Sequence, residues 1–179
     1  MSKKIIMIEE FKPPSMIQEC KSPIMIKDYE INPHSMLIMP IQYGSKLYSR
    51  IIELEREVIV PFRPSVVIDK SCKYFGSSLS GRLNGAKHLT GYTQKVPITI
   101  DPTNNIIFLP THSSTNEQCH WLALRHFVSL KSETSSSTLV TFSKNKSYII
   151  PCSKWSLGNQ IGRSAHFCFM LDRQLKNNF

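Results

Sequence analysis

Short runs of apolar and β-branched residues recur in the first third of the chain and predict β-strands. The clearest of these runs are residues 24–26 and 36–39. From Lys46 to Val60 apolar and polar residues alternate, as they do along a strand whose side chains point to opposite faces. We therefore expect a strand or a pair of strands there, although residues 51–57 also fit a helical turn.

The hydrophobic period changes after Pro61, and a helix is expected there. The helix begins near Pro64, since proline is typical of first helical positions, and it ends at Gly76. Its apolar face is formed by Val67, Ile68, Cys72 and Phe75. Residues 78–87 predict a second short helix, which is weakened by its two glycines.

Strands dominate the next part of the chain. Residues 96–110 predict a hairpin, because apolar residues alternate before a turn rich in Pro and Asn and a continuous apolar run follows it. Three more strand-like segments, at 120–130, 138–142 and 148–150, are joined by polar connections. A helical pattern resumes at Ser153, a typical capping residue. The stripe expected to face the core consists of Leu157, Ile161, Ala165, Cys168 and Phe169.

Together these elements predict an α+β fold, a single domain with antiparallel sheet and a few short helices. Residues 1–24 contain prolines and methionines without a steady period. We expect them to form a loosely ordered N-terminal extension. Residues 25–179 are expected to form the folded domain.

Charge is distributed unevenly along the 179 residues, whose formal net charge is +9. Residues 1–57 carry 8 basic and 8 acidic side chains, residues 58–116 carry 6 and 2, and residues 117–179 carry 8 and 3. The excess therefore belongs to the last two thirds of the chain. Such a chain favours anionic partners, nucleic acid first and an acidic membrane surface second. The alternative is an ordinary solvated surface.

Several classes of protein lack support in the sequence. No apolar run reaches the roughly 18 residues of a transmembrane span, and the apolar start is too short for a secretory signal. The 5 cysteines are widely spaced without a C-x-x-C pair. That pattern argues against a disulfide framework and a cysteine zinc site, and it favours the cytoplasm. No nucleophile elbow, P-loop or dinucleotide fingerprint is present.

One cluster, Cys119 with His112, His120 and His126, invites a catalytic or metal-binding interpretation. If residues 120–130 form one strand, His120 and His126 lie about 20 Å apart and cannot share a metal ion. We expect a partly buried thiol and surface histidines instead. Carboxylates are too sparse in the basic two thirds for acid–base hydrolysis. No catalytic residue, metal or cofactor is predicted.

The segment from Lys70 to Lys87 carries the most suggestive chemistry. Its cations recur every few residues, separated by Gly, Ser and Asn, which allow the backbone to approach phosphate closely. The helix that starts after Gly76 would add N–H groups at its N-terminus. Arg82 suits a narrow minor groove in A·T-rich DNA. The alternative is a loop-and-cap segment with solvated cations.

An ordered series of segments carries a family resemblance. The matching segments are 69–78, 81–82, 97–104, 108–111, 113–115, 118–121 and 140–143, with a weaker match at 159–161 and Arg163. In these segments the chain, from about Asp28 to Arg173, resembles the ComK family, the competence transcription factors of Bacillus-type bacteria.

The resemblance implies a non-enzymatic activator of genes for DNA uptake and recombination. Proteins of the family bind paired A-rich and T-rich boxes, through the minor groove, as dimers that associate further. The implied partners are A/T-rich double-stranded DNA, a second copy in a homodimer or a tetramer on DNA, RNA polymerase and a Clp-protease adaptor, with no membrane. In relatives a C-terminal part beyond the position of Phe179 is linked to activation and adaptor recognition. Residues 169–171 look like an adaptor motif, but their place in the helical stripe favours a core role.

From charge and small-residue context we predict DNA contacts by Arg63, Lys70, Lys73, Arg82, Lys87, Lys95, Lys154 and Arg163. Among these, Arg82 is expected to enter the minor groove. A second function stays open, a binding module for RNA or single strands. Its base-stacking residues would be Tyr74, Phe75, Tyr92, Trp121 and Phe127.

Overall fold

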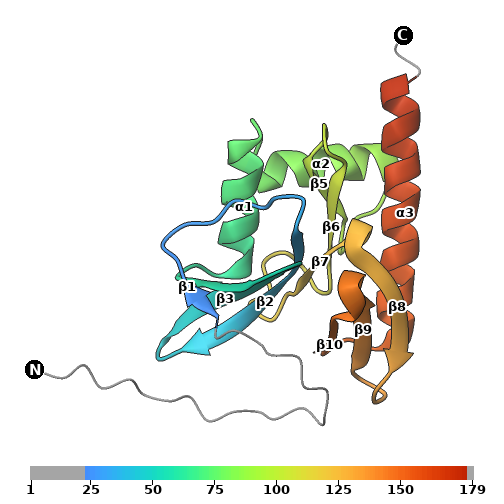
Figure 1. Cartoon of the computed structure of the whole chain (residues 1–179). Coiled ribbons are helices and arrows are strands. Elements are labelled where there is room, and N and C mark those ends of the chain that lie inside the picture. Colours follow the sequence, from blue (N-terminus) through green and yellow to red (C-terminus); the bar gives the residue numbers. More distant parts are fainter. Residues whose placement is uncertain (1–22, 177–179) are drawn as a thin grey trace, which may run out of the picture.

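A computed structural model describes residues 23–176 of the chain (Figure 1). The expected N-terminal extension, residues 1–24, lies outside the described residues except at its end, and it stays a prediction. The described part forms two β-sheets and three α-helices, so the α+β class is confirmed.

A seven-stranded sheet forms the centre of the molecule, with the strand order β1-β4-β3-β2-β7-β6-β5. Neighbouring strands are antiparallel, except that β1 runs parallel to β4. The strands are β1 (Ile24–Met25), β2 (Ser35–Tyr43), β3 (Lys46–Glu53), β4 (Glu57–Val60), β5 (Ile98–Asp101), β6 (Ile106–Pro110) and β7 (Trp121–Ala123). The hairpin expected at 96–110 is confirmed as β5 and β6.

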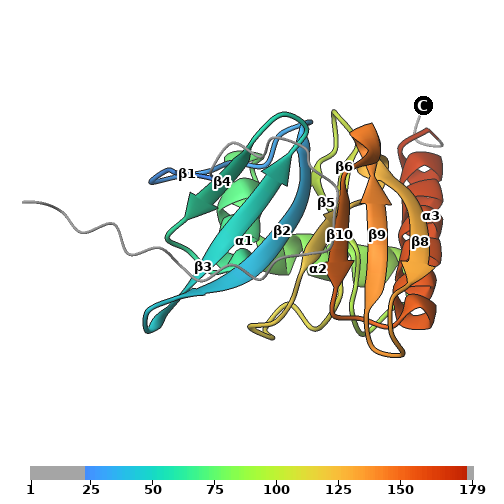
Figure 2. The same ribbon diagram turned by 60° about the horizontal axis from the view of Figure 1, so that its bottom comes forward.

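A second, antiparallel sheet has the order β10-β9-β8 and lies between the first sheet and the C-terminal helix (Figure 2). Its strands are β8 (Phe127–Ser132), β9 (Thr138–Phe142) and β10 (Ser147–Ile150). Two single 3-10 turns, Leu124–His126 and Ser143–Asn145, precede β8 and β10.

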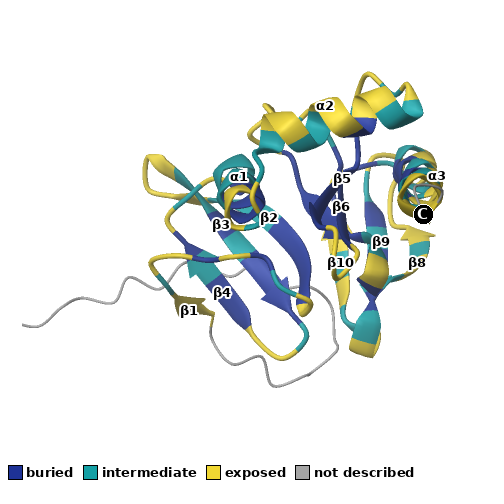
Figure 3. Cartoon of the chain, turned by 90° about the horizontal axis from the view of Figure 1, so that it is seen from above, coloured by how far each residue is buried: buried dark blue, intermediate teal, exposed yellow. Residues whose placement is uncertain are grey.

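Successive residues of the central strands fill two different cores, because adjacent side chains on a strand point to opposite faces. The first core, shared with α1 (Pro64–Tyr74), includes Ile38, Ile51, Phe108 and Trp121. The second core, shared with the three-stranded sheet and the C-terminal helix, includes the neighbouring residues Leu37, Ile52, Leu109 and Leu122. The centre of the seven-stranded sheet is therefore buried on both faces, whereas β1 at its edge is exposed (Figure 3).

Two further helices complete the fold. Helix α2 (Leu79–Thr90) runs from α1 to α3 (Lys154–Lys176) across one end of the molecule (Figure 1). Its N-cap is Ser78, whose Oγ accepts a hydrogen bond from the Gly81 amide at 3.1 Å. Its end is Gly91, which has the left-handed φ of +73° that favours glycine. Within residues 23–176 no helix combines the length and apolar character needed to cross a bilayer.

The three helices start where the sequence predicts. The first ends at Tyr74, slightly before the expected Gly76, whereas the second and third extend further than expected. The first helix has Pro64 in its first turn and a buried face that includes Val67, Ile68 and Cys72. The second continues past residue 87 to Thr90, because Gly91 is the first residue with a left-handed backbone. The third spans 23 residues and is therefore not short, and Ser153 Oγ accepts the Ser156 amide at its start.

The stripe predicted for α3 is partly wrong. Leu157 is buried, but Ala165 and Phe169 are exposed, and the buried residues further along are Gln160, Ser164 and Phe167. This face is buried because α3 packs against β6 and α2, where Phe167 joins Ile107 and Ala86 in a third small core. The expected core role of residues 169–171 therefore does not hold for Phe169.

Two strand predictions are also corrected. Residues 120–130 do not form one strand, because the chain leaves the first sheet after Ala123 and enters the second at Phe127 through a 3-10 turn. The helical turn considered for residues 51–57 is absent, since β3 and β4 form an antiparallel hairpin there.

The histidines of that segment are not on the surface. His120 and His126 are each only 7% exposed. His126 Nε2 lies 2.7 Å from the Pro33 carbonyl oxygen, and His120 Nδ1 lies 2.9 Å from that of Gln118. Burial lowers the pKa of both rings, so they are neutral at pH 7. The prediction of surface histidines is wrong for these two, because the crossing after Ala123 carries His126 inside and His120 directly precedes the buried strand β7.

A buried polar network ties the segment before β2 to the end of β3. The Tyr29 hydroxyl donates to Glu53 Oε1 at 2.7 Å and also bonds Ser35. Burial alone would raise the pKa of Glu53, but hydrogen bonds from Arg56, Asn32 and Tyr29 outweigh burial and lower that pKa. Glu53 is thus charged and paired in the folded protein. Its contribution to stability is present above the unfolded pKa and is lost as the pH falls through the folded pKa.

We expect Tyr29→Phe to lower the free energy of unfolding at pH 7 by about 2 kcal/mol, because it removes a buried hydrogen bond to a charged carboxylate. It should also shrink the loss of stability on acidification below about pH 4.5, since the pKa of Glu53 moves back toward its ordinary value. Urea unfolding at several pH values measures both effects. Tyr43→Phe, at the exposed tip of the β2–β3 hairpin, is the matched control and should change stability little. An unchanged stability of Tyr29→Phe would contradict the role of the network.

Candidate nucleic-acid interface

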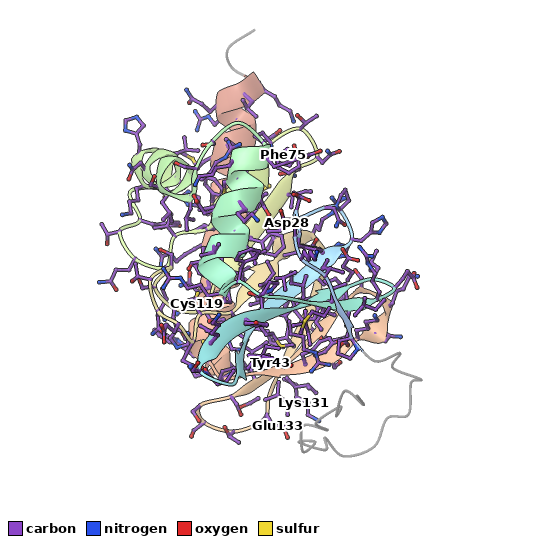
Figure 4. All side chains as sticks on the ribbon, turned by 90° about the vertical axis from the view of Figure 1, so that its left-hand side faces the viewer. Asp28, Tyr43, Phe75, Cys119, Lys131 and Glu133 are labelled. Atoms are coloured by element: carbon purple, nitrogen blue, oxygen red, sulfur yellow. The ribbon has the colours of Figure 1, made fainter. Side chains whose placement is uncertain are left out.

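The cations predicted on α1 are paired with carboxylates. The Lys70 ammonium bonds Asp28, which lies beside α1 in Figure 4, and stands 4.3 Å from the centre of the Phe62 ring. Lys73 lies 2.8 Å from Asp69 Oδ2. The hydrogen bond from Lys70 lowers the pKa of Asp28. Arg63 is exposed at the residue before the helix. The charge of two of these three cations is therefore partly balanced within the protein.

Arg82 on α2 reaches back into the fold. Its Nη2 donates to the carbonyl oxygens of Phe75 at 3.2 Å and Ile100 at 3.4 Å. The guanidinium thereby connects the turn between α1 and α2 to β5. Lys87 lies in the last turn of the same helix and is exposed.

The amides at the start of α2, expected to face phosphate, have acceptors within the chain. The Leu79 amide donates to Asp69 Oδ1 at 2.9 Å, and the Gly81 amide donates to Ser78 Oγ. Such bonds commonly satisfy the free backbone N–H groups at a helix N-terminus. Part of the small-residue chemistry between Lys70 and Lys87 is thus used to cap and join the two helices.

Two other predicted cations, Lys95 and Arg163, line one groove although they are far apart in the sequence, and a third, Lys154, directly precedes the lining residue Trp155. Lys95 lies on the loop between α2 and β5, whereas Lys154 and Arg163 lie on the first half of α3. The groove between this loop and the helix has a volume of about 620 Å³. It is lined by Tyr92, Gln94, Lys95, Trp155, Ser156, Gly158, Asn159, Gln160, Gly162 and Arg163. We refer to it as the α3 groove.

Contacts from α3 fix the loop side of the groove. Arg163 Nη2 donates to the Gln94 carbonyl oxygen at 2.7 Å, and its guanidinium carbon lies 4.1 Å from the centre of the Tyr92 ring. The Tyr92 hydroxyl lies 2.8 Å from His166 Nδ1. Because a planar guanidinium can stack and donate at the same time, Arg163 positions the loop as well as adding charge.

Lys95 is held in an uncommon backbone conformation. Its φ is +47°, in the left-handed region that a non-glycine residue rarely adopts. Its Nζ lies 3.4 Å from Ser156 Oγ across the groove. Burial and then the Lys95 charge lower the pKa of His112 on the neighbouring loop. Among residues 23–176 no carboxylate forms an ion pair with Lys95.

The helix side of the groove is free of acidic residues and poor in bulky ones. No Asp or Glu occurs between Glu133 and Asp172. Gly158 and Gly162, four residues apart, lie on one face of α3 and line the groove. Gln160 also lines it, is 2% exposed, and its Oε1 has no hydrogen-bond partner in the described part of the chain. The absence of acids favours an anionic ligand, and the Gln160 oxygen is an acceptor for a hydrogen-bond donor on that ligand.

The described residues do not support covalent or metal-dependent chemistry. Burial raises the pKa of the Cys72 and Cys119 thiols to about 11, so neither is a thiolate at neutral pH. Between Pro23 and Lys176 no three His, Cys, Asp or Glu side chains gather as metal ligands do.

Comparison with known proteins agrees with the sequence resemblance. The family model described as ComK protein matches residues 26–176. The chain belongs to the ComK family. It is 37% identical over 150 residues to the "Competence transcription factor" of Bacillus subtilis (strain 168), covering 84% of this chain and 77% of that protein. No solved structure shows significant similarity to this chain.

Membership of the ComK family is membership of a family of transcription factors, which are not enzymes. The matched region contains both walls of the α3 groove and all eight predicted cations. Reasoning from the sequence missed Trp155, Gln160 and the two helix glycines. The long stretch without acids between Glu133 and Asp172 was the available signal for this surface.

A glycine in the α3 groove gives a stability prediction. A Cβ added at Gly162 meets no atom within 4 Å, and the same holds for Gly85 on α2. We expect Gly162→Ala and Gly85→Ala each to raise the free energy of unfolding by about 1 kcal/mol, since glycine is a poor helix former. Urea unfolding measures this gain. A loss of stability in Gly162→Ala alone would contradict the open space around the Cβ position of Gly162.

Proposed function

We propose that this ComK homologue is a sequence-selective, DNA-binding activator of competence genes, acting in the cytoplasm. The observation that carries the proposal is the α3 groove. There Lys95 and Arg163 converge from two distant segments without a carboxylate among the lining residues, and Lys154 directly precedes the lining residue Trp155. Duplex DNA is the polyanion that a transcription factor of this family would place there.

The proposed target is A/T-rich double-stranded DNA with paired boxes, which the protein approaches through the minor groove. Charge in the α3 groove supports affinity for phosphate, which depends little on sequence. Preference for A/T-rich boxes rests on the family resemblance, together with the fact that a narrow A·T minor groove concentrates negative potential. The two contributions are separable, because the first weakens with salt and the second depends on base composition.

A second group of cations stays in the proposed interface, namely Arg63, Lys70, Lys73, Arg82 and Lys87. The surface ion pairs of Lys70 and Lys73 are exposed and weak enough for DNA phosphates to replace the carboxylates. Arg82 would have to exchange its bonds to Phe75 and Ile100 for a minor-groove contact. We therefore expect these residues to contribute less than the α3 groove.

Other features of the proposal rest on the resemblance alone. They are residues 25–179 as the DNA-binding domain, a homodimer that associates further on DNA, and RNA polymerase and a Clp-protease adaptor as partners. The alternative of a single-strand binding module is weakened, because Trp121, one of its stacking residues, is fully buried.

The first test is binding to matched duplexes. In gel-shift or anisotropy titrations at about 0.15 M salt, a duplex with two A/T boxes should bind at least about a hundredfold more tightly than a G·C-rich duplex of equal length. A single-stranded A/T oligonucleotide should compete poorly. Equal, weak binding to both duplexes would exclude a sequence-selective regulator, and preferential single-strand binding would favour the alternative module.

The salt dependence tests the placement of the interface. Lys154→Ala should lower the slope of log Kobs against log salt concentration by about 1, because one phosphate contact is lost. Lys46→Ala is the matched control, since Lys46 is an exposed cation on the β2–β3 hairpin, on the opposite side of the molecule from α3 (Figures 1 and 2). Its slope should equal that of the wild type. Equal slopes for all three proteins would place the interface elsewhere.

A further inference from the structure

Trp155 has no structural role that accounts for its position. Its side chain is 79% exposed, the highest value among the large apolar residues that the structure describes. Between Pro23 and Lys176 its ring takes part in no aromatic pair and no cation–π contact. A single exposed apolar residue is ordinary on a protein surface. Trp155 is distinguished by the residues that surround it in the α3 groove.

Those neighbours match a nucleic acid in charge and shape. Trp155 is the second residue of α3, follows Lys154 and lines the groove together with Lys95 and Arg163. On the same wall, Gly158 and Gly162 leave the helix backbone accessible. A flat, unpartnered π-surface surrounded by cations and without acids is suited to a ligand that carries both bases and phosphates.

We propose that Trp155 is a base-contacting wedge: its indole enters the minor groove of the bound duplex and packs partly between two base pairs. This inference rests on the proposed function. Lys95, which lines the same groove, and Lys154, which precedes Trp155 on α3, would hold the phosphates of the same step. A TA step in an A/T-rich duplex unstacks easily, and minor-groove proteins commonly insert an apolar side chain at flexible steps. The preference for A/T-rich DNA would then depend partly on how readily the step opens.

The two tryptophans of the chain make the inference directly measurable. Trp121 is 0% exposed, so quenching of fluorescence by acrylamide reports mainly on Trp155. In the full-length wild-type protein, a saturating duplex with A/T boxes should quench the emission and shield Trp155 from acrylamide. In Trp155→Phe, whose only tryptophan is Trp121, the same duplex should leave the emission unchanged. That variant is the internal control for the signal.

Affinity variants give an independent readout. Trp155→Ala should weaken binding to the A/T duplex about tenfold or more, as the loss of one stacked base contact does, while Trp155→Phe should stay within about threefold. Because the side chain is exposed, Trp155→Ala should melt at the wild-type temperature. Phe169→Ala is the matched control, because Phe169 is an exposed aromatic residue on the same helix outside the α3 groove. This variant should bind the A/T duplex as tightly as the wild type does.

The outcomes separate the inference from the function on which it rests. If the wild type binds the A/T duplex selectively while Trp155 stays open to acrylamide and Trp155→Ala binds normally, the wedge is wrong and the DNA-binding function stands. If single strands shield Trp155 and duplexes do not, insertion into a duplex is also wrong. If the wild type binds no duplex selectively, the proposed function fails and the wedge fails with it.

Discussion

The structure depends on the burial of one sheet on both of its faces. Each central strand of the seven-stranded sheet must be apolar at successive positions, since neighbouring side chains enter different cores. One core requires α1, and the other requires the three-stranded sheet together with the start of α3. Because the sheet is covered twice, the chain has to cross from one sheet to the other. The crossing after Ala123 carries His126 inside with its own hydrogen-bond partners.

The α3 groove is a consequence of that arrangement. Once Leu157 is packed into the second core and Phe167 into the third, the opposite face of α3 is left toward solvent beside the loop before β5. Arg163 then holds this loop through Gln94 and Tyr92, which places Lys95 across from Ser156. The left-handed backbone at Lys95 is maintained by these surrounding contacts. Cations from two segments therefore face one volume, although nothing in their local sequences brings them together.

Much of the fold was predictable because local signals and tertiary packing agree. Pro64, Ser78 and Ser153 mark the three helix starts, alternation marks β3 and β5, and a continuous apolar run marks β6. The errors occur where tertiary contacts overrule local pattern. Apolar residues run on from Trp121 through Phe127, so one strand was expected, yet the two halves pair in different sheets. On α3, Gln160 and Ser164 are buried and Phe169 is exposed, because position relative to β6 and α2 outweighs hydrophobicity.

By itself the sequence determined the α+β class, the helix starts, the family and the basic character of the last two thirds of the chain. These properties are either local, such as capping and periodicity, or sums over residues, such as net charge. Only the tertiary structure decided which cations lie close together. Lys70, Lys73 and Arg82 look like the interface in the sequence, but they have partners within the protein. Lys95 and Arg163 look unrelated in the sequence, yet they line one groove, because the distance between charges is set by packing and not by position along the chain.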